Sequence, residues 1–261
     1  MSSKFPEHPE RRAVVVTGAS SGIGQATAEM LAAAGHPVVI GARRLGELQG
    51  IAESIRQDGG EAHAFHLDLA DPESILRFVD ATHTAVGEVE VIVANAARNQ
   101  VGSILETPPE ELEAVLDVNV GGTHRLVSEL LPPMVQRQRG DVVVVTSDVV
   151  TNPRPSMAAY VTSKWGLEGY VRALQMELEG SGVRVSIVRP GPTLTEMGWD
   201  WDMTRTQAAL DEWTRWGLVR HDSYMRPSAV AQAVAAVIAM PRGAQITSLE
   251  IHPEAPVRED D

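Results

Sequence analysis

Three side chains in the middle of the chain, Ser147, Tyr160 and Lys164, could together carry out acid–base chemistry on a carbonyl or alcohol oxygen. The pattern over 158–179 predicts a helix, which places Tyr160 and Lys164, four residues apart, on one face. A nearby ammonium favours the phenolate and would lower a phenol pKa that is ordinarily about 10. Ser147 follows a predicted buried strand, 142–145, so its hydroxyl could join the phenol around one substrate oxygen. The same Tyr–Lys spacing also occurs in ordinary amphipathic helices, so the rest of the chain has to decide.

A glycine-rich turn near the start of the chain is typical of a dinucleotide phosphate site. A β-branched run over 12–17 predicts a buried strand, and the sequence GASSGIG and an alanine-rich helix over 25–34 follow it. Glycine lets the main chain approach a pyrophosphate, and a helix start supplies free N–H groups and a positive dipole end. A plain tight turn could contain the same glycines, but the flanking strand and helix favour the phosphate site.

The end of the next predicted strand, 37–42, favours NADP over NAD. The carboxylate that accepts a ribose hydroxyl at this position in NAD-binding chains is absent, because Ala42 is followed by Arg43 and Arg44. A guanidinium binds phosphate oxygens in a bidentate manner and therefore suits a ribose 2′-phosphate. A solvated arginine pair opening the helix over 45–57 is the alternative, so NAD use stays open.

Strands and helices alternate throughout, which predicts one α/β domain over 1–261, a Rossmann-like doubly wound sheet of about seven parallel strands with helices on both faces. The cofactor half would span about 10–150 and the catalytic and substrate half about 140–252, before an acidic tail over 253–261. Thr107 to Glu110 resemble a capping box that begins a long helix. Within this helix, Asn119 stands beside two glycines and indicates either a functional kink or a merely loosened turn.

The connection over 193–226 is unusually long for a compact domain and contains most of the tryptophans, namely Trp199, Trp201, Trp213 and Trp216. Such a segment is either a lid over a bulky apolar substrate or an interface helix that packs on the body.

Composition excludes several classes of protein. With 22 basic and 35 acidic residues the net charge is −13, which argues against a nucleic-acid partner. The absence of cysteine excludes disulfides, thiol catalysis and cysteine metal sites, and the scattered histidines predict no metal site. No apolar run has the length of a signal peptide or a membrane span, so we expect a cytoplasmic protein without a membrane partner.

With these pieces in place, the chain resembles the classical short-chain dehydrogenase/reductase family along nearly its whole length. The matching motifs are TGASSGIG at 17–24, Asp68, Asn95-Ala96, Asn119 in DVNV, Ser147, YVTSK at 160–164 and PGPTLT at 190–195. The resemblance implies a catalytic tetrad. Ser147 would orient the substrate oxygen, Tyr160 would exchange a proton with it, Lys164 would lower the tyrosine pKa and hold the nicotinamide ribose, and Asn119 would anchor a relay water through its main chain.

The resemblance also implies a cofactor site. The glycine turn would hold the pyrophosphate, Asp68 the adenine, Thr193 and Thr195 the carboxamide, and Arg43 the 2′-phosphate. The full implied set is Gly18, Ser20, Ser21, Gly22, Ile23, Gly24, Arg43, Arg44, Asp68, Leu69, Asn95, Ala96, Tyr160, Lys164, Pro190, Gly191, Thr193 and Thr195.

The expected function is NADP(H)-dependent interconversion of a secondary alcohol and a ketone by a homodimer or homotetramer, on a bulky apolar small molecule. An NAD-preferring alcohol dehydrogenase and a non-catalytic NADP(H) sensor or scaffold are the alternatives, whereas an enoyl reductase usually has its tyrosine and lysine further apart. Three departures from the family pattern stand out. Ala97 replaces the usual glycine, Ser21 replaces a basic residue common in NADP users, and the ending at 250–253 lacks the usual glycines, which favours a dimer over a tetramer.

Overall fold

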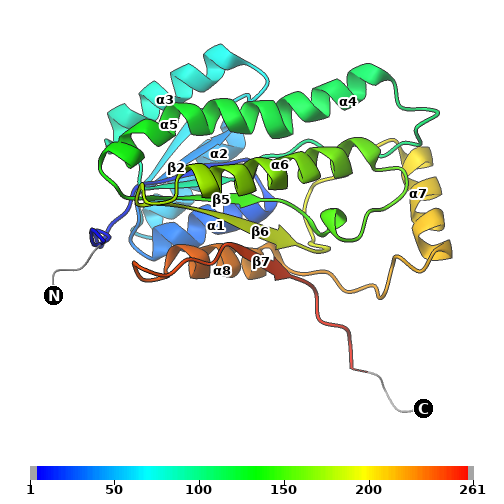
Figure 1. Ribbon diagram of the computed structural model, residues 1–261. Helices are drawn as coiled ribbons and strands as arrows, with labels where there is room; N and C mark the ends of the chain where they lie inside the picture. Colours follow the sequence, from blue (N-terminus) through cyan, green and yellow to red (C-terminus); the bar gives the residue numbers. More distant parts are fainter. Residues whose placement is uncertain (1–4, 258–261) are drawn as a thin grey trace.

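Seven short strands form the centre of the protein, which a computed structural model describes over residues 5–257. They pair in the order β3-β2-β1-β4-β5-β6-β7, and all pairs are parallel (Figure 1). The expected doubly wound sheet is therefore confirmed, and its order reverses between β1 and β4, where such sheets bind ligands at their carboxyl ends. We call this side of the sheet the carboxyl edge. The strands are β1 (Val14–Thr17), β2 (Val38–Ala42), β3 (Ala62–His66), β4 (Val91–Ala94), β5 (Gly140–Val145), β6 (Val183–Pro190) and β7 (Ser248–Ile251).

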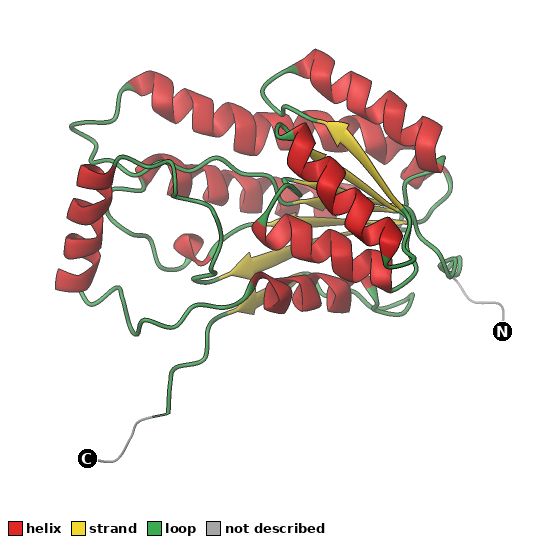
Figure 2. Cartoon of the chain, turned by 180° about the vertical axis from the view of Figure 1, so that it is seen from behind, coloured by secondary structure: helices red, strands yellow, loops and turns green. Residues whose placement is uncertain are grey.

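Helices cover both faces of the sheet (Figure 2). They enclose two separate hydrophobic layers. The central strands are buried along their whole length and mostly apolar, because neither of their faces meets water. One layer packs under α1 (Gly22–Ala33), α2 (Leu45–Gln57) and α8 (Pro227–Ile238), and the other under α3 (Pro72–Val86), α5 (Thr123–Gln136) and α6 (Ala158–Glu177). No helix among residues 5–257 combines the length and the apolar character that crossing a membrane requires.

The interruption expected at Asn119 is a π-helical segment, η1 (Asp117–Gly122), which joins α4 (Pro109–Leu116) directly to α5. π-helical turns are rare and often occur at functional sites, because the inserted residue redirects side chains and main-chain groups. Gly122 in this segment packs so closely on Leu69 that a side chain there would overlap the main chain. The glycine therefore lets the π-helical segment approach the loop that joins β3 to α3.

The capping box expected at 107–110 is wrong. The helix begins at Pro109 and its N-cap is Pro108, which has no side-chain acceptor. Thr107 consequently lies one residue too early to cap, and its hydroxyl donates a hydrogen bond of 2.9 Å to the carbonyl of Ser103. Of the acidic tail expected over 253–261, residues 258–261 lie outside the described part of the chain.

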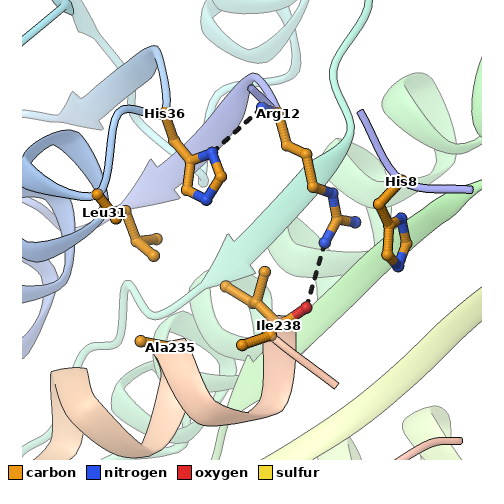
Figure 3. Close-up of a pocket in the computed structure, with 8 residues that line it drawn as sticks. His8, Arg12, Leu31, His36, Ala235 and Ile238 are labelled. Atoms are coloured by element: carbon orange, nitrogen blue, oxygen red, sulfur yellow. Dashed lines mark hydrogen bonds between the residues drawn. The ribbon is translucent and has the colours of Figure 1, made fainter. Parts of the chain in front are cut away.

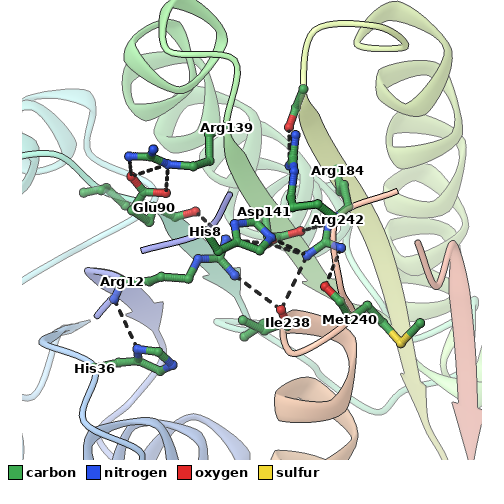
Figure 4. A network of polar contacts seen from close by, with 12 residues as sticks. His8, Arg12, His36, Glu90, Arg139, Asp141, Arg184, Ile238, Met240 and Arg242 are labelled. Atoms are coloured by element: carbon green, nitrogen blue, oxygen red, sulfur yellow. Dashed lines mark hydrogen bonds and ion pairs between the residues drawn. The ribbon is translucent and has the colours of Figure 1, made fainter. Parts of the chain in front are cut away.

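A buried group of charges holds the amino ends of the strands together (Figure 4). Asp141 on β5 is 2% exposed and accepts hydrogen bonds from Arg12, just before β1, and from Arg184 on β6. Arg184 also donates to the carbonyl of Met240 at 2.8 Å, just beyond the end of α8. The three charges therefore connect two strands, the segment before a third and the chain after α8, at the edge of the sheet opposite the carboxyl edge.

Candidate active site

Ser147, Tyr160 and Lys164 lie together at the carboxyl edge. Ser147 comes just after β5, where its hydroxyl caps a single 3-10 turn by accepting a hydrogen bond of 3.3 Å from the N–H of Val149. The same hydroxyl is a neighbour of the Tyr160 phenol and acts to lower its pKa. One helical turn further along α6, the Lys164 Nζ lies 5.5 Å from the centre of the Tyr160 ring and donates to the Val145 carbonyl at 2.9 Å. The fold thus brings these three side chains to one place.

Asn119 reaches the same region from the π-helical segment and is completely buried. Its Oδ1 accepts a hydrogen bond of 2.7 Å from the N–H of Arg98, and its Nδ2 donates to the Arg98 carbonyl and to the Ser163 hydroxyl, each at 2.9 Å. Both side-chain atoms thus have protein partners. A proton relay past this residue would therefore use its main chain, as the resemblance implies.

Burial sets the pKa values of the two titratable groups, and it does so against the expectation from sequence. Removal from water raises the pKa of Tyr160 to about 12; Ser147 and Arg154 oppose this shift and Asp148 adds to it. Burial also lowers the pKa of Lys164 to about 7. The expectation that the lysine lowers the tyrosine pKa is therefore wrong for the protein chain by itself, because the ammonium is desolvated too and its hydrogen bond goes to a main-chain carbonyl.

The site contains a partly buried ion pair that the sequence does not predict. Asp148 accepts a hydrogen bond of 3.3 Å from the Ser147 hydroxyl and pairs with Arg154, whose guanidinium nitrogen lies 2.7 Å from a carboxylate oxygen. The Arg154 guanidinium also lies 5.9 Å from the centre of the Trp213 ring. The only local signal was a carboxylate directly after a candidate catalytic serine, because the loop that returns Arg154 has no periodic pattern.

The connection over 193–226 covers the carboxyl edge. It contains α7 (Met203–Arg215), which stands across the end of the sheet in Figure 1. Trp201 donates its indole N–H to the Asn99 carbonyl at 3.0 Å, and Trp213 donates to the Pro155 carbonyl at 2.8 Å. These two hydrogen bonds tie the segment to the loops that follow β4 and β5.

The four tryptophans of this connection divide into two pairs. Trp201 and Trp213 are partly buried and pack against a small apolar cluster that includes Tyr160. Trp199 and Trp216 are 80% and 65% exposed. Of the four, only Trp201 and Trp213 are placed to line an apolar substrate site beside Tyr160.

The glycine turn has the geometry that a phosphate cradle requires. Gly18 and Gly22 have φ angles of +66° and +56°, a left-handed conformation that glycine adopts without strain. A Cβ atom at Gly18 would come within 2.7 Å of the Ala96 Cα, and one at Gly22 within 3.1 Å of the Thr195 side chain. Because α1 begins at Gly22, its free N–H groups face the carboxyl edge. These residues fit a dinucleotide pyrophosphate.

Other expected cofactor residues support this turn or lie beside it. Asn95 donates its side-chain amide to the Thr17 carbonyl at 2.9 Å, and the Ala96 N–H donates to the Thr17 hydroxyl at 2.9 Å, so both fix the turn against β4. Asp68 accepts a hydrogen bond of 3.0 Å from the N–H of Ala70. At the same edge lie Ile23 and Gly24 in α1, Leu69 after β3, and Pro190, Gly191, Thr193 and Thr195 at and after the end of β6. Their contacts with a cofactor stay predictions.

The two arginines after β2 have different surroundings. Arg43 is exposed and makes no side-chain hydrogen bond or ion pair with any residue of the described part of the chain. Arg44 donates to the hydroxyls of Ser20 and Ser21, and its guanidinium pairs with Glu196 at 2.8 Å. The sequence does not predict Glu196 at the site, since it lies far from Arg44 along the chain, in the connection over 193–226. We call this connection the covering segment.

A cavity lies away from these residues, at the opposite edge of the sheet. It has a volume of about 260 Å³ and lies between the ends of α1 and α8, where Arg12, His36 and Ile238 are among its lining residues (Figure 3). It therefore lies beside the amino ends of the strands, whereas sheets of this kind bind their ligands at the carboxyl ends.

Comparison with known proteins places the chain in a family. A family model described as short chain dehydrogenase matches residues 12–206. A glycine betaine reductase of Emericella nidulans is 35% identical over 196 residues, which are 75% of this chain but 15% of that much longer protein. A putative ketoacyl reductase of the monensin polyketide synthase from Streptomyces virginiae is 37% identical over 188 residues, or 71% of this chain and 72% of that protein.

A solved structure agrees over nearly the whole chain. An alcohol dehydrogenase from Thermococcus sibiricus in complex with 5-hydroxy-NADP superposes with a TM-score of 0.81 and 29% identity, covering 95% of this chain and 100% of that one. The glycine cradle and the Ser–Tyr–Lys arrangement thus occur in a chain whose sequence and fold both match, and the protein belongs to the short-chain dehydrogenase/reductase family.

Proposed function

We propose that this protein is an NADP(H)-dependent oxidoreductase that interconverts a secondary alcohol and a ketone, with Tyr160 as the acid–base group. The observation that carries the proposal is the convergence of Ser147, Tyr160 and Lys164 at the carboxyl edge, next to a glycine cradle. All three are buried, and burying polar groups costs free energy unless they are paired. Their position is therefore better explained by chemistry than by packing.

The three side chains would divide the work on one substrate oxygen. Ser147 and Tyr160 would bind the oxygen from two directions, and a phenol whose pKa is about 12 is fully protonated at neutral pH. Tyr160 can therefore donate a proton to the oxygen of a ketone as it is reduced. The nicotinamide, when bound, supplies or accepts the hydride. Lys164, whose pKa is about 7, can return a proton to the phenolate, and solvent protons would pass along the main chain near Asn119.

Two further features support the choice of cofactor and substrate. Arg43 offers a free guanidinium directly after β2, which suits a ribose 2′-phosphate, and the related alcohol dehydrogenase was solved with an NADP derivative. The apolar cluster around Tyr160, with Trp201 and Trp213, favours a bulky apolar ketone over a sugar. We also propose a homodimer or homotetramer, because Trp165 and Met176 on α6 are 56% and 71% exposed.

The test is NADPH oxidation with a panel of alicyclic, aromatic and sugar ketones, using the wild type and the Tyr160→Phe variant. We expect turnover of the bulky apolar ketones by the wild type and its loss in the variant, with NADPH binding retained in both. A wild type that binds NADPH but reduces no ketone would favour the sensor or scaffold alternative. Equal rates with NADH would instead contradict the proposed preference for NADP(H).

A further inference from the structure

The carboxylate of Glu196, in the covering segment, lies beside the glycine turn, where Arg44 donates hydrogen bonds to it and to the turn hydroxyls. One oxygen of Glu196 accepts a hydrogen bond of 2.8 Å from the Arg44 guanidinium. The same guanidinium nitrogen donates to the hydroxyls of Ser20 at 3.0 Å and Ser21 at 3.1 Å. One carboxylate thus shares a guanidinium with two hydroxyls of the turn.

These donors form an anion site. Arginine binds a carboxylate and a phosphate with the same geometry, and hydroxyls donate to either. Ser20 and Ser21 belong to the glycine turn, and Arg44 is the second residue after β2, the strand end at which this fold distinguishes a ribose 2′-phosphate from a 2′-hydroxyl. The carboxylate therefore lies where a phosphate on the ribose would find its donors.

Glu196 is an anion at neutral pH and is held only loosely. Its pKa is lowered, chiefly by the hydrogen bond from Arg44 and then by the neighbouring Ser21 hydroxyl. Both partners of the ion pair are exposed to water, and such pairs are weak and screened by salt. A phosphate with nearly two negative charges can consequently displace the carboxylate from Arg44.

We propose that Glu196 is a cofactor-discriminating residue, whose carboxylate competes with the 2′-phosphate of NADP(H) for Arg44 and the turn hydroxyls. NAD(H) has a neutral 2′-hydroxyl and would bind with the ion pair intact. The wild type would then prefer NADP(H) over NAD(H) by a smaller affinity ratio than it would if Glu196 did not compete for Arg44. This inference rests on the proposed use of NADP(H).

Displacement of Glu196 would also affect the covering segment. Glu196 directly follows Thr195 and precedes the two partly buried tryptophans, Trp201 and Trp213, so its ion pair with Arg44 connects the start of the segment to the start of α2. A cavity of about 230 Å³ lies beside this connection and is lined in part by Ser21, Thr195 and Trp199. Binding of a 2′-phosphate would therefore break this ion pair and release the start of the covering segment, which lies nearest the adenosine half of the cofactor.

The test is isothermal titration of adenosine 2′,5′-bisphosphate and of adenosine 5′-monophosphate into the wild type, Glu196→Gln and Glu47→Gln. Glu47 is the matched control, because its carboxylate is also near Arg44, at 4.0 Å, but accepts no hydrogen bond from it. We expect Glu196→Gln to bind the bisphosphate about two- to fivefold more tightly, as befits loss of an exposed competitor, with unchanged affinity for the monophosphate. Glu47→Gln should change neither affinity by as much.

If the wild type prefers the bisphosphate, two outcomes would overturn the proposal for Glu196 and leave the NADP(H) assignment in place. One is that Glu196→Gln changes both affinities by the same factor, as a general clamp on the nucleotide would. The other is that Glu47→Gln strengthens bisphosphate binding as much as Glu196→Gln, which would show a diffuse charge effect. A wild type without any preference for the bisphosphate would overturn the NADP(H) assignment together with this inference.

Discussion

Lys164 and Tyr160 lie on one face of α6, with the lysine Nζ 5.5 Å from the centre of the phenol ring, and burial reverses their usual order of acidity. The pKa of Tyr160 is raised to about 12 and that of Lys164 is lowered to about 7, so the lysine gives up its proton first. A phenolate left after proton donation can therefore be protonated again from the lysine side. This order suits the reduction of a ketone better than the oxidation of an alcohol.

The first prediction concerns the phenol itself. Tyr160→Phe removes the proton donor and should lower kcat for ketone reduction by about 10²- to 10⁴-fold, the usual contribution of a positioned acid–base group. The matched control is Tyr170→Phe, because Tyr170 lies on the same helix and burial also raises its pKa to about 12, yet it contacts His124 rather than the site. Equal effects of the two substitutions on kcat would contradict the assignment.

The second prediction uses the lowered pKa of Lys164. Between pH 7 and about 10.5 the unfolded chain carries a proton on this residue that the folded chain has lost. The free energy of unfolding should therefore gain about 1.4 kcal/mol per pH unit from this group as the pH rises, and lose that contribution as the pH falls toward 7. The raised pKa of Tyr160 opposes this only above about pH 10.

Urea unfolding at several pH values checks this prediction against Lys164→Met, which lacks the titrating group. The variant also loses the hydrogen bond to Val145, so its stability will differ at every pH, and only the slopes are compared. Parallel dependences of the two proteins on pH would show that Lys164 keeps its ordinary pKa in the folded chain.

The third prediction concerns the free guanidinium of Arg43. Arg43→Leu should weaken NADPH binding by about 1.5 to 3 kcal/mol, or about ten- to a hundredfold, because a charge-assisted hydrogen bond to phosphate is lost, while NADH binding should not change. Arg56→Leu in α2, the helix that begins just after Arg43, is the control, since Arg56 already donates to Ala62 and Glu53. Fluorescence titration of the reduced cofactors measures both constants, and equal losses for NADPH and NADH would argue against a 2′-phosphate contact.

Local patterns were sufficient for much of the fold and for the centre of the site. The alternation of apolar strands with amphipathic helices predicted the parallel sheet, and the four-residue spacing placed Tyr160 and Lys164 on one face of α6. Asp71 immediately before Pro72 is likewise typical of a helix start, and its side chain caps α3 by accepting a hydrogen bond of 2.9 Å from the N–H of Glu73. Each of these features depends only on residues that are close in sequence.

Features that depend on three-dimensional surroundings could not be predicted in this way. The ion pair of Arg44 and Glu196 joins residues 152 positions apart, and nothing in the sequence near either residue indicates the other. The pKa of Tyr160 was expected from its lysine neighbour alone, whereas burial by the covering segment and the sheet has the larger effect. The capping box was misplaced because a Pro-Pro pair moved the start of the helix by one residue.

The last prediction concerns the buried charges of Arg12, Asp141 and Arg184 at the amino ends of the strands. Asp141→Asn leaves the guanidinium groups of Arg12 and Arg184 without a counter-charge in a place that water does not reach, and the free energy of unfolding should fall by about 3 to 5 kcal/mol. Glu61→Gln is the control, because it removes a carboxylate from an exposed pair with Arg11 at 2.6 Å and should cost at most about 1 kcal/mol. Urea unfolding of both variants decides the matter. Equal losses would mean that the buried group holds the strands no better than a surface pair does.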